Sequence, residues 1–295
     1  MLTPDPPAPS SAEPATTALR LTGRDVLPLL HRIGTQALLD LAPGGARATL
    51  FCDFRGRLLH RAVVAVTADG AVWLLRHDAP GAALAAFVDR HVFRDDVRIE
   101  DRSAVLWVAG AEGAQRPAAT LERGAIPERV EAGDGVALIV RAGARPSRAP
   151  AAQAERERRR ILAGRAAHGH EIAEAFHPFE VGLAADVHLD KGCYTGQEAL
   201  QRLVTYRSVR RGLALVGGRG APPQPPAEVE SVGERIGVLT SAVAGEEPGA
   251  WIGLAVLKRE IVEAGAPLTI GSVPVTEAAR LFPARDPLGL RRGGS

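Results

Sequence analysis

The sequence predicts an α+β protein with an antiparallel sheet, followed by a small C-terminal β-barrel or sandwich. Two observations indicate this fold class. Between residues 18 and 108, strand-like segments follow one another along the chain and are framed by helical patterns, which is typical of an α+β domain. Between residues 210 and 283, short strand-like runs are punctuated by glycine, which is typical of a barrel or sandwich.

The first region contains two expected helices, one that residues 23–25 open and one at 80–92, because apolar residues recur there at helical spacing. Their inward faces would consist of Val26, Leu29, Leu30 and Ile33 in the first helix and of Leu84, Phe87 and Val88 in the second. The expected strands, which turns separate, span 18–23, 47–54, 57–66, 71–76, 97–100 and 104–108.

The middle of the chain is less regular. Residues 109–134 are rich in alanine, glycine and glutamate and are expected to be helical or looped. A strand is expected at 135–141, and a charged helix at 151–162 with Gly164 as its C-cap. Further short helical stretches are expected within 165–190, and another helix after residue 196.

The glycine- and proline-rich segment 217–226 is the clearest predicted domain boundary. The predicted organisation is a disordered tail at 1–17, an α+β region at 18–209 with two subdomains, a β-barrel at 210–283 and a second tail at 284–295. The length of 295 residues agrees with two domains.

Composition excludes several classes of protein. The formal net charge of +2 argues against binding to nucleic acid by charge alone. Two cysteines cannot form a disulfide framework or a four-cysteine metal site. Neither a signal peptide nor an apolar run long enough to cross a membrane is present, so a cytoplasmic protein without a membrane partner is expected.

One segment stands out chemically, KGCYTGQE at 191–198. Gly192 and Gly196 flank Cys193 and indicate a tightly turned backbone. Lys191 is one of only two lysines among 36 basic residues, and an ammonium close to the sulfur would stabilise a reactive thiolate. The alternative is a turn before a helix, with Gln197 and Glu198 in its first turn and a cysteine that only packs.

The sequence lacks the common motifs for nucleotide binding, nucleophilic catalysis and metal binding. It contains no phosphate-binding loop, dinucleotide fingerprint or nucleophile elbow. His168 and His170 form the only close histidine pair, and no cysteine or acid stands at a recognised ligand spacing from them. No metal site is therefore predicted.

The segment Lys191–Glu198 resembles the KGCYxGQE signature of the YgfZ family of folate-binding proteins, within the glycine-cleavage T-protein (aminomethyltransferase) superfamily. The resemblance covers about residues 18–283. It extends to further segments, which read LTGRD at 21–25, GRLL at 56–59, RILAG at 160–164, FHPFE at 176–180 and GVLTSA at 237–242.

The resemblance implies a GcvT-like ring of two α+β subdomains plus a C-terminal β-barrel around a folate channel. It implies tetrahydrofolate or a derivative as the ligand, and a role in the assembly or repair of iron–sulfur enzymes. Cys193 would then be the functional thiol, with Lys191, Gly192, Thr195, Gly196 and Gln197 as the rest of its motif. One branch of the family is linked to thiolated tRNA bases.

One departure bears on activity. The aminomethyltransferases carry an acid after the turn that resembles Gly56–Leu59, whereas His60 and Arg61 follow it here. Arginine stays protonated in proteins and cannot act as a base. Glycine cleavage is therefore not expected, although folate binding is.

Folate itself needs three kinds of partner. A carboxylate fits the N–H and amino edge of the pteridine, and Glu180 or Glu198 would supply it. Aromatic walls suit its flat faces, and Tyr194 or Phe176 would provide one. Arginine suits the glutamate tail, and this residue would be Arg160, which resembles the folate-facing arginine of the superfamily, or Arg202. Each also has a purely structural alternative, in helix capping, packing or a solvated charge.

Three functions are compatible with these residues. The first is a folate-binding accessory protein for iron–sulfur proteins, in which Cys193 holds a cluster transiently with help from a partner. The second is a folate-dependent one-carbon transferase, the only enzymatic alternative. The third is a tRNA-binding or tRNA-modification factor, in which Arg202, Tyr206, Arg207, Arg210 and Arg211 contact the nucleic acid.

Overall fold

The computed structural model describes residues 15–112, 129–131, 136–143 and 149–281. The described chain divides into two compact units. The sheet unit contains the described residues up to 143 together with 186–199, and the barrel unit contains 149–185 and 200–281. The chain therefore leaves the sheet unit and returns to it for the segment that carries KGCYTGQE.

The sheet unit is built on a five-stranded antiparallel sheet with the order β2-β3-β4-β1-β5. Its strands are β1 (Thr17–Thr22), β2 (Ala46–Cys52), β3 (Leu58–Val66), β4 (Val72–Arg76) and β5 (Arg98–Asp101). The two helices are α1 (Val26–Ile33) and α2 (Ala82–Asp89). All seven were predicted to within a few residues, and the buried residues of both helices are the ones expected.

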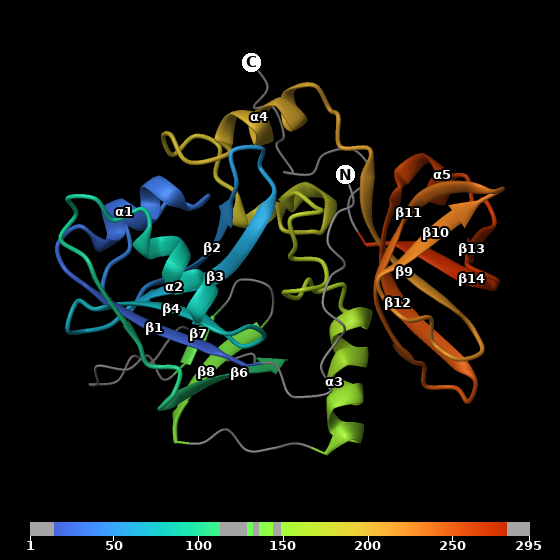
Figure 1. The fold of residues 1–295 in the computed structure, drawn as a ribbon, viewed down its shortest axis with the longest axis horizontal. Coiled ribbons are helices and arrows are strands. Elements are labelled where there is room, and N and C mark those ends of the chain that lie inside the picture. The colour runs from blue at the N-terminus through green and yellow to red at the C-terminus, as the bar shows by residue number, and fades with distance from the viewer. Residues whose placement is uncertain (1–14, 113–128, 132–135, 144–148, 282–295) are drawn as a thin grey trace. The chain divides into compact units, whose positions relative to one another are not determined.

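Strand alternation lets this sheet bury both faces. Leu19, Val64 and Leu74 belong to one core, which they share with α1 and α2. Val63 and Trp73, which point to the opposite face, belong to a second core. That core is closed by a three-stranded sheet of order β6-β8-β7. Figure 1 shows the two helices and the three-stranded sheet on opposite faces of the larger sheet.

The expectation of helix or loop at 109–134 is wrong in the part that the structure describes. β6 runs Leu106–Glu112, and β7 covers Arg129–Glu131. Both pair with β8 (Val136–Ala142), whose strand was predicted. Alanine and glycine suggested helix or loop here, but pairing with β8 and burial of Val108 and Val130 outweigh that weak preference.

The barrel unit begins with α3 (Pro150–Leu162), followed by a short 3₁₀ turn, η1 (Pro178–Glu180). A second 3₁₀ turn, η2 (Ala184–Asp186), lies where the chain passes from the barrel unit to the sheet unit. Ala163 is the C-cap of α3, and Gly164, which was predicted as the cap, is the left-handed residue directly after it with a φ of +63°. Six strands then close a barrel in the order β10-β11-β12-β9-β14-β13. They are β9 (Arg211–Arg219), β10 (Ala227–Ser231), β11 (Glu234–Ala244), β12 (Ala250–Lys258), β13 (Leu268–Ile270) and β14 (Val273–Arg280).

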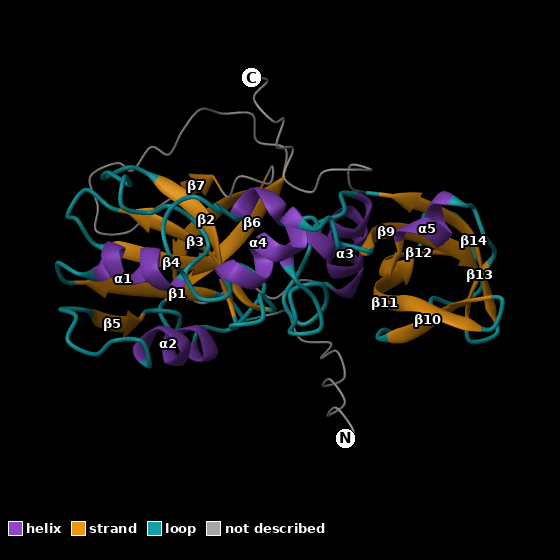
Figure 2. Cartoon of the chain, turned by 90° about the horizontal axis from the view of Figure 1, so that it is seen from above, coloured by secondary structure: helices purple, strands orange, loops and turns teal. Residues whose placement is uncertain are grey.

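The barrel confirms the C-terminal part of the predicted fold. A short helix, α5 (Arg259–Glu263), follows β12, and strands make up most of the remainder (Figure 2). The domain boundary predicted at 217–226 is wrong, because Gly217 and Gly218 lie inside β9 and pair with β12. A β-carbon on Gly218 would stand 2.8 Å from the indole nitrogen of buried Trp251, so this glycine admits a core side chain.

The remaining helix, α4 (Gln197–Thr205), follows the KGCYTGQE turn as predicted. The expected tails at 1–17 and 284–295 lie almost wholly outside the described residues, and β1 begins at Thr17. Within the described chain, no helix combines the length and the apolar character that a membrane crossing demands.

Candidate functional site

The cysteine turn, residues 191–198, lies in the sheet unit against the tip of the β2–β3 hairpin. Gly196 has a φ of +83°, and a β-carbon there would stand 2.4 Å from the Asp53 carbonyl oxygen. Gly192 has a φ of +106° with open space around it. Both glycines therefore permit a conformation that other residues rarely adopt, and Gly196 also permits the close approach.

The two cysteines have opposite surroundings. Cys193 is exposed at the turn, as a functional thiol requires. Cys52 lies in the core of the sheet unit, as expected, and burial raises the pKa of its thiol to about 12. At neutral pH only Cys193 is therefore accessible to a reagent, a metal or a partner.

Lys191 is directed at two groups other than the sulfur. Its Nζ donates a hydrogen bond to the His31 carbonyl, and it lies 4.8 Å from the centre of the Tyr194 ring. Burial lowers the pKa of Lys191 to about 8. Within the described residues these are the two partners that the structure gives the ammonium, and a contact between Lys191 and the thiolate stays a prediction.

Tyr194 is the buried aromatic residue of the turn, with 7% of its surface exposed. Its hydroxyl has no hydrogen-bond partner among the described residues, and burial raises its pKa. A buried donor without a partner costs free energy unless a ligand or water meets it. Among the described residues of the turn, this hydroxyl is therefore a buried polar group whose hydrogen-bonding capacity is unused.

The rest of the motif holds the turn in place. The Gln197 side-chain nitrogen donates to the Leu189 carbonyl at 2.6 Å. Glu198 is exposed in the first turn of α4, where a carboxylate favours the helix dipole, and Thr195 is half-buried. Arg202 is exposed one turn further along α4, so the helical period places it on the same face as Glu198.

Arg160 lies in the barrel unit, where other residues accept all five of its N–H groups. Its acceptors are both carboxylate oxygens of Glu157 (2.9 and 2.6 Å), Glu171 Oε2 (2.8 Å), the Arg165 carbonyl (2.5 Å) and Ser241 Oγ (2.5 Å). Burial alone would lower the pKa of Arg160, but the carboxylates of Glu171 and Glu157 outweigh it and raise the pKa. No N–H group of Arg160 is left for a folate tail in this structure.

Glu171, which the sequence analysis missed, organises this cluster. It is fully buried and accepts hydrogen bonds from Arg160, the Ala167 amide, Thr240 Oγ1 and Ser241 Oγ. We call Glu157, Arg160, Glu171, Thr240 and Ser241 the Glu171 cluster. It joins the RILAG and GVLTSA segments, which are far apart in the sequence. The available signal was an acid directly before an apolar residue, Ile172, in a stretch without neighbouring arginine.

Glu180, the other proposed pteridine contact, is also engaged within the barrel unit. Its Oε1 accepts from Arg211 Nε at 2.6 Å, and its Oε2 accepts from the His177 amide at 3.1 Å. The Arg211 guanidinium lies 5.8 Å from the centre of the buried Phe176 ring. These three side chains therefore contact one another instead of presenting an open surface.

A carboxylate does lie beside Arg61, where the sequence departs from the aminomethyltransferases. Arg61 Nε donates to Asp186 Oδ2 at 2.7 Å, and both side chains are nearly buried. The Asp186 carbonyl also accepts from Thr35 Oγ1 at 2.7 Å. Asp186 was not predicted from the sequence, because the two partners are 125 positions apart. Its engagement with arginine disfavours a role as a base.

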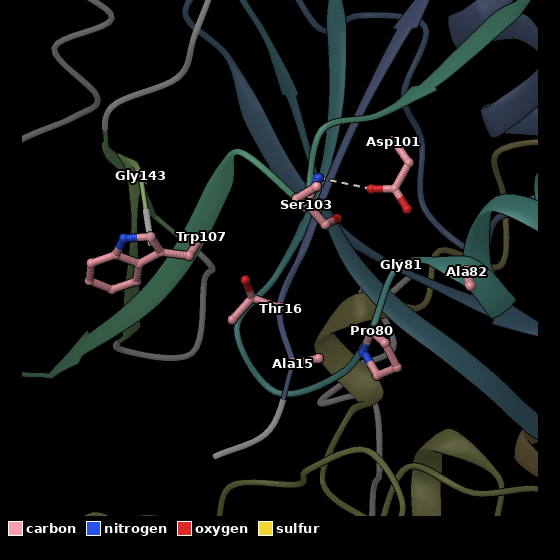
Figure 3. A pocket seen from close by; sticks show the side chains of 10 residues that line it. Ala15, Thr16, Pro80, Gly81, Ala82, Asp101, Ser103, Trp107 and Gly143 are labelled. Carbon is pink, nitrogen blue, oxygen red and sulfur yellow. Dashed lines mark hydrogen bonds between the residues drawn. The ribbon is translucent and has the colours of Figure 1, made fainter. Parts of the chain in front are cut away.

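A hollow of about 420 Å³ opens elsewhere in the sheet unit, with Trp107 on one side and Asp101 on the other (Figure 3). Asp101 accepts a hydrogen bond from the Ser103 amide at 2.8 Å. None of the site residues predicted from the sequence lines this hollow. The cysteine turn and the hollow are therefore separate features.

Comparison with known proteins gives partial matches. No family model matches the chain. A chloroplastic protein of Arabidopsis thaliana named as a transferase is 34% identical over 115 residues, or 39% of this chain and 26% of that protein. The aminomethyltransferase of Moorella thermoacetica is 36% identical over 132 residues, or 44% of this chain and 34% of that protein. The matched region therefore spans at most about a third of either relative.

The fold itself has a solved counterpart. Glycine cleavage system aminomethyltransferase T from Bartonella henselae superposes with a TM-score of 0.68 over 93% of this chain and 86% of that chain, at 15% identity. The two proteins share a fold. The chain is thus similar in sequence to part of an aminomethyltransferase and shares the fold of another, while membership of the superfamily and the narrower YgfZ assignment stay predictions.

Proposed function

We propose that this chain is a folate-binding accessory protein of the YgfZ type, which serves iron–sulfur enzymes or their assembly proteins in the cytoplasm. The observation that carries the proposal is the cysteine turn, in which exposed Cys193 adjoins buried Tyr194 with its unpartnered hydroxyl. The aminomethyltransferase fold supports a folate as the ligand.

The residues of the turn fit a folate in part. The Tyr194 hydroxyl is a spare donor for a polar atom of a pteridine, and its ring is already an apolar wall. Glu198 and Arg202 remain the proposed contacts for the pteridine edge and the glutamate tail, because both are exposed. Arg160 and Glu180 do not fit that role, since their polar atoms are engaged within the chain. A bound tetrahydrofolate would supply one-carbon chemistry.

Cys193 would act on a cluster as cargo. One thiolate can ligate one iron, so the other ligands must come from glutathione, a partner protein or a second chain. Cys52 cannot supply one, because it is buried in the core. We therefore expect Cys193 to act in transfer or repair, with the cluster held only while a partner is bound.

The folate half of the proposal is tested by calorimetry. Purified protein is titrated with tetrahydrofolate and with its 5-formyl derivative, and micromolar binding of at least one is expected. Arg160→Lys keeps the charge in the Glu171 cluster and should leave the affinity unchanged. Failure of both folates to bind would contradict this half.

The thiol half is tested in a strain that lacks the chromosomal gene. Wild-type protein and the Cys52→Ala variant should restore the activity of iron–sulfur enzymes, whereas Cys193→Ala should not. Equal restoration by Cys193→Ala would show that the thiol has no part in the function. Cys52→Ala is the matched control because it removes the other thiol of the chain.

A specific observation favours a second candidate, a tRNA-binding factor. Tyr206 is 75% exposed at the end of α4, and Arg202, Arg207 and Arg210 are exposed around it. An exposed ring among arginines can stack a base and contact phosphates. Tight tRNA binding that weakens steeply with salt and is lost in Tyr206→Ala would support this candidate, and salt-insensitive binding would exclude it.

A further inference from the structure

The hollow in the sheet unit lies where separate stretches of the chain meet (Figure 3). Residues 15–16, 80–82 and 101–104 line it together with Trp107 of β6 and Gly143. Its volume of about 420 Å³ is within the range of pockets that hold small molecules. None of the residues to which the proposed function gives a role lines it, so the hollow is a candidate for a binding site of its own.

Asp101 is the only residue with a charged side chain among those that line the hollow. Its Oδ1 accepts a hydrogen bond from the Ser103 amide at 2.8 Å, whereas no donor among the described residues meets its Oδ2. A carboxylate oxygen accepts hydrogen bonds and binds a charged donor more strongly than a neutral one. The hollow therefore favours a ligand with a positively charged group.

Two hydroxyl groups also line the hollow. Ser103 Oγ accepts a hydrogen bond from the Ala18 amide at 3.1 Å, and Thr16 Oγ1 accepts one from the Val108 amide at 3.1 Å. Each oxygen has a second lone pair, so each can accept a further hydrogen bond from a ligand. An ammonium has three N–H donors, and the oxygens of Asp101 and these hydroxyls are the acceptors that it requires.

Gly81 leaves space beside these oxygens. Its φ of −72° and ψ of −31° are accessible to every residue, so the backbone conformation does not require a glycine. A β-carbon there would stand 3.1 Å from Asp101 Oδ2 and 3.2 Å from both Ser103 Oγ and Leu19 Cδ2. The Asp101 and Ser103 oxygens therefore border one position that a larger side chain would crowd.

The indole of Trp107 forms a wall of the hollow, and Asp101 lies on the other side (Figure 3). Trp107 alternates along β6 with Leu106 and Val108, which belong to the second core, so its side chain points away from that core. The other lining residues, apart from the two hydroxyl residues, are alanine, glycine and proline. An indole attracts a cation and packs well against an apolar body.

We propose that the hollow binds a small primary amine with an apolar body, whose ammonium meets Asp101 and Ser103 and whose body packs against Trp107. The site involves neither the cysteine turn nor a folate, so this proposal and the proposed function can fail separately. Asp101 also adjoins Gly81, the N-cap of α2, where a carboxylate favours the helix dipole. That interaction affects stability but does not distinguish a charged ligand from a neutral one.

Phenethylamine and phenethyl alcohol are matched probes, because they differ only in the ammonium and hydroxyl groups. Trp107 is the reporter, since the other two tryptophans, Trp73 and Trp251, are each 1% exposed. The tryptophan emission of the full-length protein is titrated with each probe at neutral pH. The amine should bind at least about tenfold more tightly than the alcohol, as expected for a hydrogen bond to a charged group. Trp107→Phe should abolish the change in emission, while calorimetry still detects the preference for the amine.

Three variants locate the effect. Asp101→Asn keeps an acceptor for the Ser103 amide but removes the charge, so the preference for the amine should disappear. Gly81→Ala narrows the space beside the carboxylate and should weaken amine binding about tenfold. Asp89→Asn is the matched control, because Asp89 is exposed in the last turn of α2 and does not line the hollow. It should keep the wild-type preference.

Equal binding of the two probes would contradict the proposal, and so would the lack of any saturable response to the amine up to about 10 mM. A preference that survives in Asp101→Asn, or that disappears in Asp89→Asn, would also overturn it. Circular dichroism checks that each variant is folded. If a variant does not fold, the comparison of the two probes on the wild type still decides the question.

Discussion

The cysteine turn and the Glu171 cluster contain similar numbers of polar side chains and use them in opposite ways. In the Glu171 cluster, all five N–H groups of Arg160 are accepted within the chain, and fully buried Glu171 receives four hydrogen bonds. In the cysteine turn, the Tyr194 hydroxyl has no partner among the described residues and the Cys193 thiol is exposed. The comparison indicates that the cluster stabilises the fold, and it agrees with the proposal that the turn binds a ligand.

The largest loss of stability is expected from Glu171→Ala. The substitution leaves the Arg160 guanidinium with one carboxylate fewer and leaves the buried Ser241 hydroxyl without its acceptor, whereas Thr240 Oγ1 keeps the Leu254 carbonyl. Removing one partner of a buried pair costs about 3–5 kcal/mol. The free energy of unfolding, measured in urea, should fall by that amount.

Glu247→Ala is the control, because Glu247 forms an exposed ion pair with Arg219 in the same unit. It should leave the urea midpoint unchanged. A loss below about 1 kcal/mol for Glu171→Ala would mean that the cluster does not stabilise the fold in the way the contacts suggest.

The next largest loss of stability is expected when the two glycines of the turn are substituted. Both Gly192 and Gly196 have positive φ, but only Gly196 faces backbone, at 2.4 Å from the Asp53 oxygen. Gly196→Ala should therefore cost about 1–3 kcal/mol more than Gly192→Ala, which is the penalty for overpacking. Urea denaturation of the two variants measures the difference, and equal losses would show that the turn does not rest on the hairpin.

The lowered pKa of Lys191 determines how the free energy of unfolding changes at alkaline pH. Folding lowers its pKa from 10.5 to about 8, so between these values the unfolded chain binds more protons than the folded one. Stability must then rise with pH through this window. Cys52 acts oppositely above pH 9, because folding raises its pKa to about 12.

The difference in the free energy of unfolding between wild type and Lys191→Met isolates the contribution of the lysine, because both proteins keep Cys52. Measured from pH 7.5 to 10.5, the stability of wild type relative to the variant should increase with pH. A constant difference would mean that Lys191 keeps its ordinary pKa and is not half-buried against Tyr194.

Local patterns predicted most of the fold. The apolar spacing of α1 and α2 and the turns between β2, β3 and β4 were sufficient for these elements, because helix period and turn chemistry are local. β7 was not predicted, because three residues are too few to show a periodicity. The strand depends on its pairing with β8. The false boundary at 217–226 arose because Gly218 looks like a linker residue, whereas it admits Trp251.

The site was predictable only in part. Cys193 and its two glycines could be identified, since their chemistry lies within eight consecutive residues. The partners of Arg160 and Arg61 could not, because Glu171, Ser241 and Asp186 are brought to them by tertiary structure. Charge matching suggested Arg160 as a ligand contact, but it does not reveal whether the chain itself has already satisfied the charge.

The most direct test of the comparison is a pair of hydroxyl deletions, Tyr194→Phe and Ser241→Ala, each measured by urea denaturation and by titration with a folate that the wild type binds. We predict that Tyr194→Phe leaves stability unchanged within about 0.5 kcal/mol and weakens folate binding about two- to tenfold, and that Ser241→Ala lowers stability by about 1–2 kcal/mol and leaves binding unchanged. If Tyr194→Phe destabilised the protein without affecting binding, the hydroxyl would belong to the fold, and the assignment of the turn as the ligand-facing region would be wrong.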